Sequence, residues 1–216
     1  YMTYPSPSSK DFSKNINTIF SKYEIPEQKK TFDEICFPKS YSLQIPQMFL
    51  AEYMNPKTPY RGLLVYHKIG SGKTCAAISV AEQFINKKNI IIVLPASLKG
   101  NFRTELRSPC AGEKYLTNEE RKIIQKMHPS DLMYVDIIKK SDDRINKYYT
   151  IYSYNKFVKL ARIGRINLTN SLLIIDEVQN MISETGVYYQ VLYNIIKPTP
   201  QNMRLVLMTA TPIFDK

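Results

Sequence analysis

Cysteine and histidine are scarce in this sequence, and the few that occur are scattered. The three cysteines, Cys36, Cys75 and Cys110, lie far apart and form no Cys-x-x-Cys pair, and the two histidines are His67 and His128. Zinc sites and disulfide frameworks are built from closely spaced sets of these residues. The sequence therefore predicts neither kind of site, and it favours a reducing compartment.

Long apolar runs and signal-peptide patterns are also missing from the printed sequence. A membrane-spanning helix needs about 18–20 consecutive apolar residues. A secretory signal needs a basic start, an apolar stretch and a small-residue cleavage site. We therefore expect no membrane partner and an intracellular location.

Acidic residues are outnumbered by basic ones. Aspartate and glutamate total 19 and lysine and arginine total 30, which gives a net charge of +11. A surplus of this size indicates a polyanionic partner, nucleic acid before membrane. Many unrelated proteins are equally basic, so the charge alone does not identify the partner.

The chain divides by pattern near residue 40. Apolar positions from Phe12 to Tyr23 share one helical face, and a second apolar cluster ends at Pro38. We therefore expect residues 1–40 to form a partly helical extension that packs on a domain covering residues 41–216.

A charged, weakly patterned stretch covers residues 108–148. We expect it to be an insertion into the domain. Thr117 followed by Glu120 has the spacing of a capping box, which predicts the start of a helix.

Short apolar runs alternate with helix-like stretches from residue 41 onward. Runs that are apolar throughout are typical of strands buried on both faces, and their alternation with helices predicts a mostly parallel sheet in an α/β fold. The five runs are 62–67, 89–95, 149–154, 171–177 and 204–210. The stretch after the first run is expected to be an amphipathic helix, with an inner stripe of Ala77, Val80, Ala81 and Phe84.

The first run leads into HKIGSGKT, residues 67–74, which has the spacing of a Walker A loop with His67 at the usual first glycine. Gly70 and Gly72 allow successive N–H groups of the loop, Ser71 included, to face one phosphate. The following helix points its positive end at the same place. Lys73 is predicted to reach the β- and γ-phosphates of ATP, and the Thr74 hydroxyl to bind magnesium.

The fourth run ends in Asp176 and Glu177, within LLIIDEVQ. This pattern is typical of a Walker B motif. Asp176 is predicted to hold the magnesium ion, and Glu177 to orient and deprotonate the attacking water.

The fifth run ends in MTATP, residues 208–212. Its Thr-Ala-Thr is uninformative alone but specific in order with the other two motifs. Thr209 and Thr211 are predicted to hydrogen-bond the acidic motif and to report the state of the γ-phosphate.

Together these motifs resemble the first RecA-like domain of a superfamily two helicase or translocase, from about residue 41 to the end of the chain. VLPASLKGNF (93–102) is similar to motif Ia and YSYNKF (152–157) to motif Ib. LVYHKIGSGKT and IIDEVQNMISETG are most similar to Swi/Snf-like ATPases of large DNA viruses. Those include the small subunit of the poxvirus early transcription factor and nucleoside triphosphate phosphohydrolase I.

The resemblance implies a motor that binds ATP and Mg²⁺ between two RecA-like domains. It places Gln47 as the residue that reads adenine. It implies nucleic-acid contacts, DNA before RNA, from loops at the carboxyl ends of the strands. The residues implied are Ser97, Lys99, Asn101, Arg103, Tyr154 and Asn155.

Two features depart from the family pattern. Gln179 stands where DEAH-type members carry histidine, and it is expected to keep the coupling role because an amide donates and accepts hydrogen bonds. The sequence stops at Lys216, right after the third motif, so the second RecA-like domain with its arginine finger is expected to lie outside it. We therefore expect slow ATP hydrolysis by this chain alone.

Three functions remain open. The first is a nucleic-acid-dependent ATPase that translocates or unwinds. The second is a transcription initiation or termination factor subunit that acts mainly by binding partners such as a viral RNA polymerase. The third, an unrelated P-loop enzyme such as a small-molecule kinase, is disfavoured by the order of motifs. The viral resemblance implies the host cytoplasm, a viral factory or the virion as the location.

Overall fold

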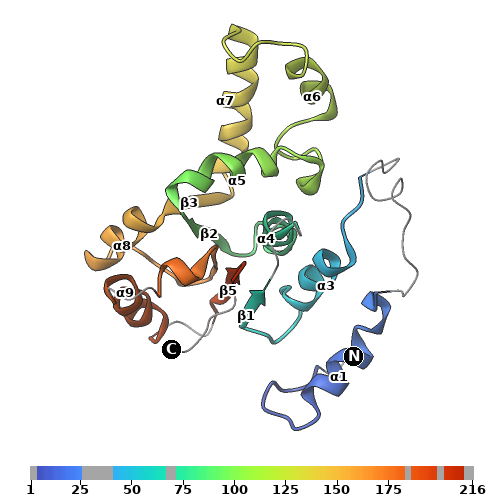
Figure 1. The fold of residues 1–216 in the computed structure, drawn as a ribbon, viewed down its shortest axis with the longest axis vertical. Coiled ribbons are helices and arrows are strands. Elements are labelled where there is room, and N and C mark those ends of the chain that lie inside the picture. The colour runs from blue at the N-terminus through green and yellow to red at the C-terminus, as the bar shows by residue number, and fades with distance from the viewer. Residues whose placement is uncertain (1–3, 26–40, 67–71, 183–185, 199–201, 212–216) are drawn as a thin grey trace.

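A computed structural model describes residues 4–25, 41–66, 72–182, 186–198 and 202–211. Its centre is a parallel sheet of five strands in the order β1-β5-β4-β2-β3 (Figure 1). The strands are β1 (Gly62–Tyr66), β2 (Asn89–Leu94), β3 (Tyr149–Ser153), β4 (Ser171–Ile175) and β5 (Arg204–Thr209). Each begins where an apolar run was predicted, so the predicted parallel α/β fold is confirmed.

Helices cover both faces of this sheet. The helices are α1 (Phe12–Ile19), α3 (Ile45–Tyr53), α4 (Lys73–Glu82), α5 (Lys99–Leu106), α6 (Asn118–Ile124), α7 (Leu132–Asn146), α8 (Tyr154–Arg162) and α9 (Val187–Ile196). Short 3-10 turns are η1 (Ser21–Tyr23), η2 (Ala96–Leu98), η3 (Pro109–Ala111) and η4 (Val178–Asn180). Helices α4 and α5 pack on one face, and α8 and α9 on the other.

The strands are apolar at successive positions because alternate side chains pack into two different cores, one on each face of the sheet. In β4, Leu172 and Ile174 belong to the core beneath α4, whereas Leu173 and Ile175 belong to the core beneath α8 and α9. All five residues of β4 are buried. Each aliphatic side chain buried in this way contributes about 1.5–3 kcal/mol. The carboxyl ends of β1, β4 and β5 consequently lie at one edge of a rigid sheet.

The prediction that α4 is an amphipathic helix was wrong. Every residue from Cys75 to Ala81 is buried, on all sides of the helix. Helix α3 covers the side that the sheet leaves open, and η3 and α5 also lie against α4. The small side chains that made the helix look half polar instead allow neighbouring elements to approach it closely.

The N-terminal segment packs on α3 through aromatic side chains. Phe20 lies edge-on to Phe49 at 5.4 Å between ring centroids, and Tyr53 stacks on Tyr60 at 4.4 Å. The second apolar cluster expected in the extension, residues 32–38, lies outside the described residues. The division into an extension over 1–40 and a domain from 41 stays a prediction.

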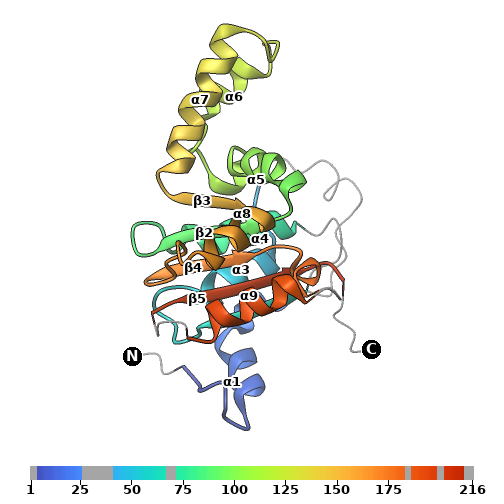
Figure 2. The same cartoon turned by 90° about the vertical axis from the view of Figure 1, so that its left-hand side faces the viewer.

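Residues 118–146 form a helical hairpin that projects from the sheet (Figures 1 and 2). The predicted capping box is confirmed, because the Thr117 and Glu120 side chains each accept from the other residue's backbone N–H. Glu120 also pairs with Arg144 of α7, at 2.6 Å. Arg144 lowers the pKa of Glu120 to about 2, so this bridge stays charged in all but strong acid.

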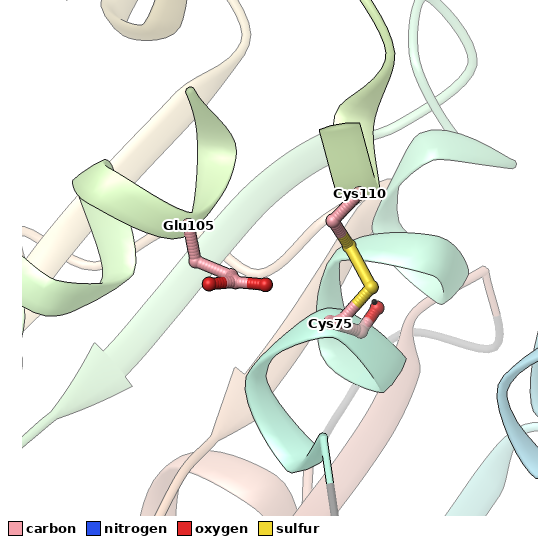
Figure 3. Close-up of side chains that lie close together, drawn as sticks. All are labelled: Cys75, Glu105 and Cys110. Atoms are coloured by element: carbon pink, nitrogen blue, oxygen red, sulfur yellow. Dashed lines mark hydrogen bonds between the residues drawn. A yellow bond between two sulfur atoms is a disulfide. The ribbon is translucent and has the colours of Figure 1, made fainter. Parts of the chain in front are cut away.

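The expectation of no disulfide was wrong. Cys75, in the first turn of α4, is bonded to Cys110 of η3, with 5.8 Å between their Cα atoms (Figure 3). The two residues are 35 positions apart, so their spacing in the sequence gave no sign of the contact. Glu105 lies beside the pair and completes the only cluster of three metal-type ligands among the described residues. Both sulfur atoms are taken by the disulfide, which leaves that cluster a single carboxylate.

The disulfide is expected to stabilise the chain by about 3–4 kcal/mol, because it closes a loop of this length in the unfolded state. Urea unfolding with and without a thiol reductant measures this difference. Cys110→Ser should unfold at the same urea concentration in both conditions, and Cys36→Ser should behave like the natural chain. A natural chain whose unfolding midpoint does not respond to reductant would show that the bond does not form in solution.

Candidate functional site

The two acidic residues after β4 are fixed by the backbone around them. The Asp176 N–H donates to the carbonyl of Val93 at 2.9 Å, which extends the pairing between β4 and β2 by one residue. The Glu177 N–H donates to the Asp176 carboxylate at 2.9 Å. Glu177 itself adopts a left-handed conformation, with φ at 52°. A strained backbone of this kind is frequent at functional sites, and here it turns the chain sharply after the strand.

Lys73, the first residue of α4, reaches both carboxylates. Its Nζ lies 3.0 Å from Asp176 Oδ1, and it also forms an ion pair with Glu177 Oε1. The side chain of Lys73 is 14% exposed, that of Asp176 is 9% exposed and that of Glu177 is 20% exposed. The predicted phosphate-binding lysine and the two predicted catalytic acids therefore lie together, although 104 positions separate Lys73 from Glu177 in the sequence.

The two acids differ in electrostatic environment. Burial raises the pKa of Asp176 and outweighs the opposing effect of Lys73. For Glu177 burial acts in the same direction, but hydrogen bonds from Gln179 and Lys73 outweigh it, and its pKa is lowered. Glu177 is therefore held as a carboxylate, the form that a general base requires.

Gln179 joins the acidic motif to the end of β5. Its Nε2 donates to Glu177 Oε2 at 2.7 Å, and its Oε1 accepts from the Thr209 hydroxyl at 2.7 Å. The Thr209 oxygen in turn accepts from the Thr211 N–H at 3.2 Å. The three residues predicted to couple the motifs thus form one hydrogen-bonded chain with Glu177.

Gln47 lies against the end of the phosphate loop. Its side chain is 4% exposed, and its Nε2 donates to the Gly72 carbonyl at 3.1 Å. Its Oε1 accepts from the Gln44 N–H at 2.9 Å, within a capping box that starts α3. A Cβ at Gly72, where φ is 73°, would lie 2.5 Å from Gln47 Nε2. Only glycine fits there, and Gln47 ties α3 to the loop.

The residues present fit a nucleotide with magnesium. Hydroxyl and carboxylate oxygens are the hard ligands that Mg²⁺ prefers. Asp176 supplies a carboxylate, and the Thr74 hydroxyl makes no hydrogen bond within the described part of the chain. Lys73 supplies the cation for phosphate, next to the N-terminus of α4. Gly70 and Ser71, also predicted to cradle phosphate, lie outside the described residues.

The residues predicted to contact nucleic acid have different surroundings. Ser97 and Asn101 are exposed and Lys99 is half-buried, all within η2 and the start of α5. Arg103 instead donates to Asp142 at 2.9 Å and to Asn146 at 2.7 Å, so its guanidinium holds α7 against α5. No local pattern revealed this pairing, because its partners are about forty positions away.

Tyr154 and Asn155 also make protein contacts. Tyr154 is 9% exposed, and its hydroxyl contacts the carbonyl oxygens of Asp176 and Glu177, the latter at 2.9 Å. This geometry favours a role in positioning the acidic motif over the predicted contact with nucleic acid. Asn155 is exposed, and its Oδ1 accepts from the Tyr188 hydroxyl of α9. Sequence analysis missed the role of Tyr154, whose one available signal was an aromatic residue directly after β3.

Comparison with known proteins identifies the family of this chain. The family described as DEAD/DEAH box helicase matches residues 51–216. The chain is 63% identical over its whole length to a putative ATP-dependent RNA helicase, R563, of Acanthamoeba polyphaga mimivirus. It spans 38% of the length of that relative. It is also 26% identical to the termination factor NPH-I homolog of African swine fever virus, over 91% of this chain and 27% of that one.

A solved structure gives the same fold. The SWI2/SNF2 ATPase core of Sulfolobus solfataricus, in complex with dsDNA, aligns with 80% of this chain and 32% of its own, with a TM-score of 0.52 at 15% identity. The predicted RecA-like fold and the resemblance to helicases of large DNA viruses are therefore confirmed. With a family match over three quarters of its residues, the chain belongs to the DEAD/DEAH box helicase family.

Proposed function

We propose that this chain is the ATP-binding half of a nucleic-acid-dependent ATPase of a large DNA virus. The observation that carries the proposal is the contact of Lys73 with Asp176 and Glu177, continued through Gln179 to Thr209. One set of contacts thus connects the start of α4 to the ends of β4 and β5. Nucleotide bound to Lys73 would therefore act on the segments that follow β4 and β5.

In this proposal the residues of the site have distinct roles. Lys73 binds the β- and γ-phosphates, Thr74 and Asp176 hold magnesium, and Glu177 accepts a proton from the attacking water. Magnesium supplies charge neutralisation on the phosphate oxygens when it is bound. Gln47 holds the end of the phosphate loop at Gly72 and lies next to the adenine of bound ATP. Both ends of its amide already have protein partners, so adenine would share or replace them.

The wider role rests on the relatives. The similar proteins do not separate DNA from RNA as the substrate, since one relative is named an RNA helicase and one solved structure holds dsDNA. The name of the African swine fever virus relative, a termination factor homolog, supports a role in viral transcription with an RNA polymerase as partner.

No helix in the described part of the chain is long and apolar enough to cross a membrane. We propose an intracellular site of action, in the cytoplasm, viral factory or virion.

Full activity in this proposal needs a second RecA-like domain. The chain spans 38% of its mimivirus relative, which leaves ample length there for such a domain. An arginine finger contributes about a thousandfold to a hundred-thousandfold in phosphoryl transfer. The residues joined in this site include no arginine, so we expect slow turnover by this chain alone.

Replacement of Lys73 tests the nucleotide site. Lys73→Ala should weaken the binding of a fluorescent ATP analogue about tenfold to a hundredfold, because a charge-assisted phosphate contact is worth about 1.5–3 kcal/mol. Lys139→Ala, an exposed lysine of α7, is the matched control and should bind as tightly as the natural chain. Equal affinity for all three proteins would remove the phosphate-binding role of Lys73.

Replacement of Gln179 tests the coupling chain. Gln179→Ala removes a hydrogen bond that lowers the pKa of Glu177, so that pKa should rise. If Glu177 is the base, the acid limb of the pH–rate profile should move to higher pH, while ATP affinity stays within about twofold. The profile is measured with protein in excess over ATP, and Gln190→Ala, an exposed glutamine of α9, is the control. Superimposable profiles for the two variants would show that Gln179 does not act through Glu177.

A further inference from the structure

A long stretch of the chain carries basic residues and no acidic ones. Between Asp143 and Asp176 the sequence contains no aspartate or glutamate, although it spans α8 and the strands on either side of it. Arg144 in this stretch is paired with Glu120. The other five basic residues are exposed, and no ion pair engages them within the described residues: Lys147, Lys156, Lys159, Arg162 and Arg165.

Helix α8 presents three of these residues on its solvent side. Its buried side consists of Tyr154, Phe157 and Val158, which pack into the core beneath α8 and α9. Lys156, Lys159 and Arg162 follow at intervals of three residues, the spacing of neighbours on one helical face. The charge is therefore gathered in a row along the helix.

The row continues around the edge of the sheet. Lys147, Thr150, Tyr152 and Arg165 line one hollow of about 280 Å³, which places the start of β3 beside the turn after α8. The Lys156 Nζ lies 5.9 Å from the centre of the Tyr152 ring, so α8 adjoins the same hollow. β3 is the last strand of the sheet, and Figure 2 shows this side of the molecule, with α8 in front.

We propose that this surface, the β3–α8 basic face, binds the phosphate backbone of nucleic acid. It is defined by Lys147, Lys156, Lys159, Arg162 and Arg165. Unpaired cations in a row match the repeated charges of a phosphodiester chain, and the half-buried ring of Tyr152 beside Lys156 offers part of a stacking surface for a base. The proposal rests on the proposed function and adds to it a contact surface that extends away from the nucleotide site.

The position of α8 connects this face to the predicted contact loops. α8 begins at the carboxyl end of β3, beside Asn155, and Arg165 lies with Lys147 at the opposite end of the same strand. A backbone bound at the loops would therefore continue along α8 and around the sheet edge. A membrane surface is the less suitable partner, because Ile163 is the only large apolar residue strongly exposed between Lys147 and Arg165.

The test compares two triple variants with the same loss of charge. Lys159→Gln, Arg162→Gln and Arg165→Gln together neutralise part of the face. Lys122→Gln, Lys126→Gln and Lys139→Gln together neutralise exposed lysines of the α6–α7 hairpin. Fluorescence anisotropy with short labelled polythymidine and polyuridine strands gives the affinity of each protein across a salt series.

The face variant should bind at least one of the strands about tenfold to a hundredfold more weakly than the natural chain. Its slope of log affinity against log salt should fall by about 2, since each lost contact to a single strand removes about 0.7. The hairpin variant should change both quantities by much less. Binding of the fluorescent ATP analogue should be the same for all three proteins.

Three outcomes would overturn the proposal: equal losses in the two variants, no binding of either strand by the natural chain, or stronger binding to phosphatidylserine vesicles with the same dependence on the face. Each of these leaves the nucleotide site untouched. Conversely, if Lys73→Ala bound the ATP analogue as tightly as the natural chain, the proposed function would be wrong. Weaker nucleic-acid binding by the face variant would still support the β3–α8 basic face.

Discussion

The ion pairs of Lys73 with Asp176 and Glu177 are the contact on which the candidate site depends. They join the first residue of α4 to the two residues after β4, and each of the three side chains is at most 20% exposed. Removing one member of such a buried pair typically costs about 3–5 kcal/mol, because it leaves the other charge without compensation. A phosphate offered to Lys73 competes directly with these carboxylates. The same lysine is therefore suited to bind nucleotide and to release the acidic motif when it does so.

The order of strands in the sheet makes these ion pairs possible. Hydrogen bonds connect the acidic motif to the neighbouring strands and to α8. β4 lies between β5 and β2, so the segment after it is bordered by Thr209 on one side and by Val93 on the other. Gln179 spans the first gap, and the Asp176 N–H closes the second. Tyr154 supports the turn from the side of α8. Displacement of Glu177 would therefore also move residues at the end of β5 and at the start of α8, which are hydrogen-bonded to this segment.

The strands and motifs could be predicted from the sequence because their signals are local. β4 is apolar at every position and ends in two acids, a pattern that needs no knowledge of its neighbours. Features that depend on partners far along the chain could not be predicted in this way. Cys75 meets Cys110 only because η3 packs on α4, and Arg103 turns to Asp142 only because α7 returns beside α5. The same limit hid the burial of Tyr154, which its neighbours in the sequence do not reveal.

A structure of the chain with a non-hydrolysable ATP analogue and Mg²⁺ tests the central claim most directly. The account predicts that Lys73 Nζ moves from Glu177 to the β- and γ-phosphates, and that Asp176 and Thr74 approach the metal. Gln179 should remain bonded to Thr209. A nucleotide bound while Lys73 keeps both ion pairs, or bound away from Gly72 and Thr74, would contradict it.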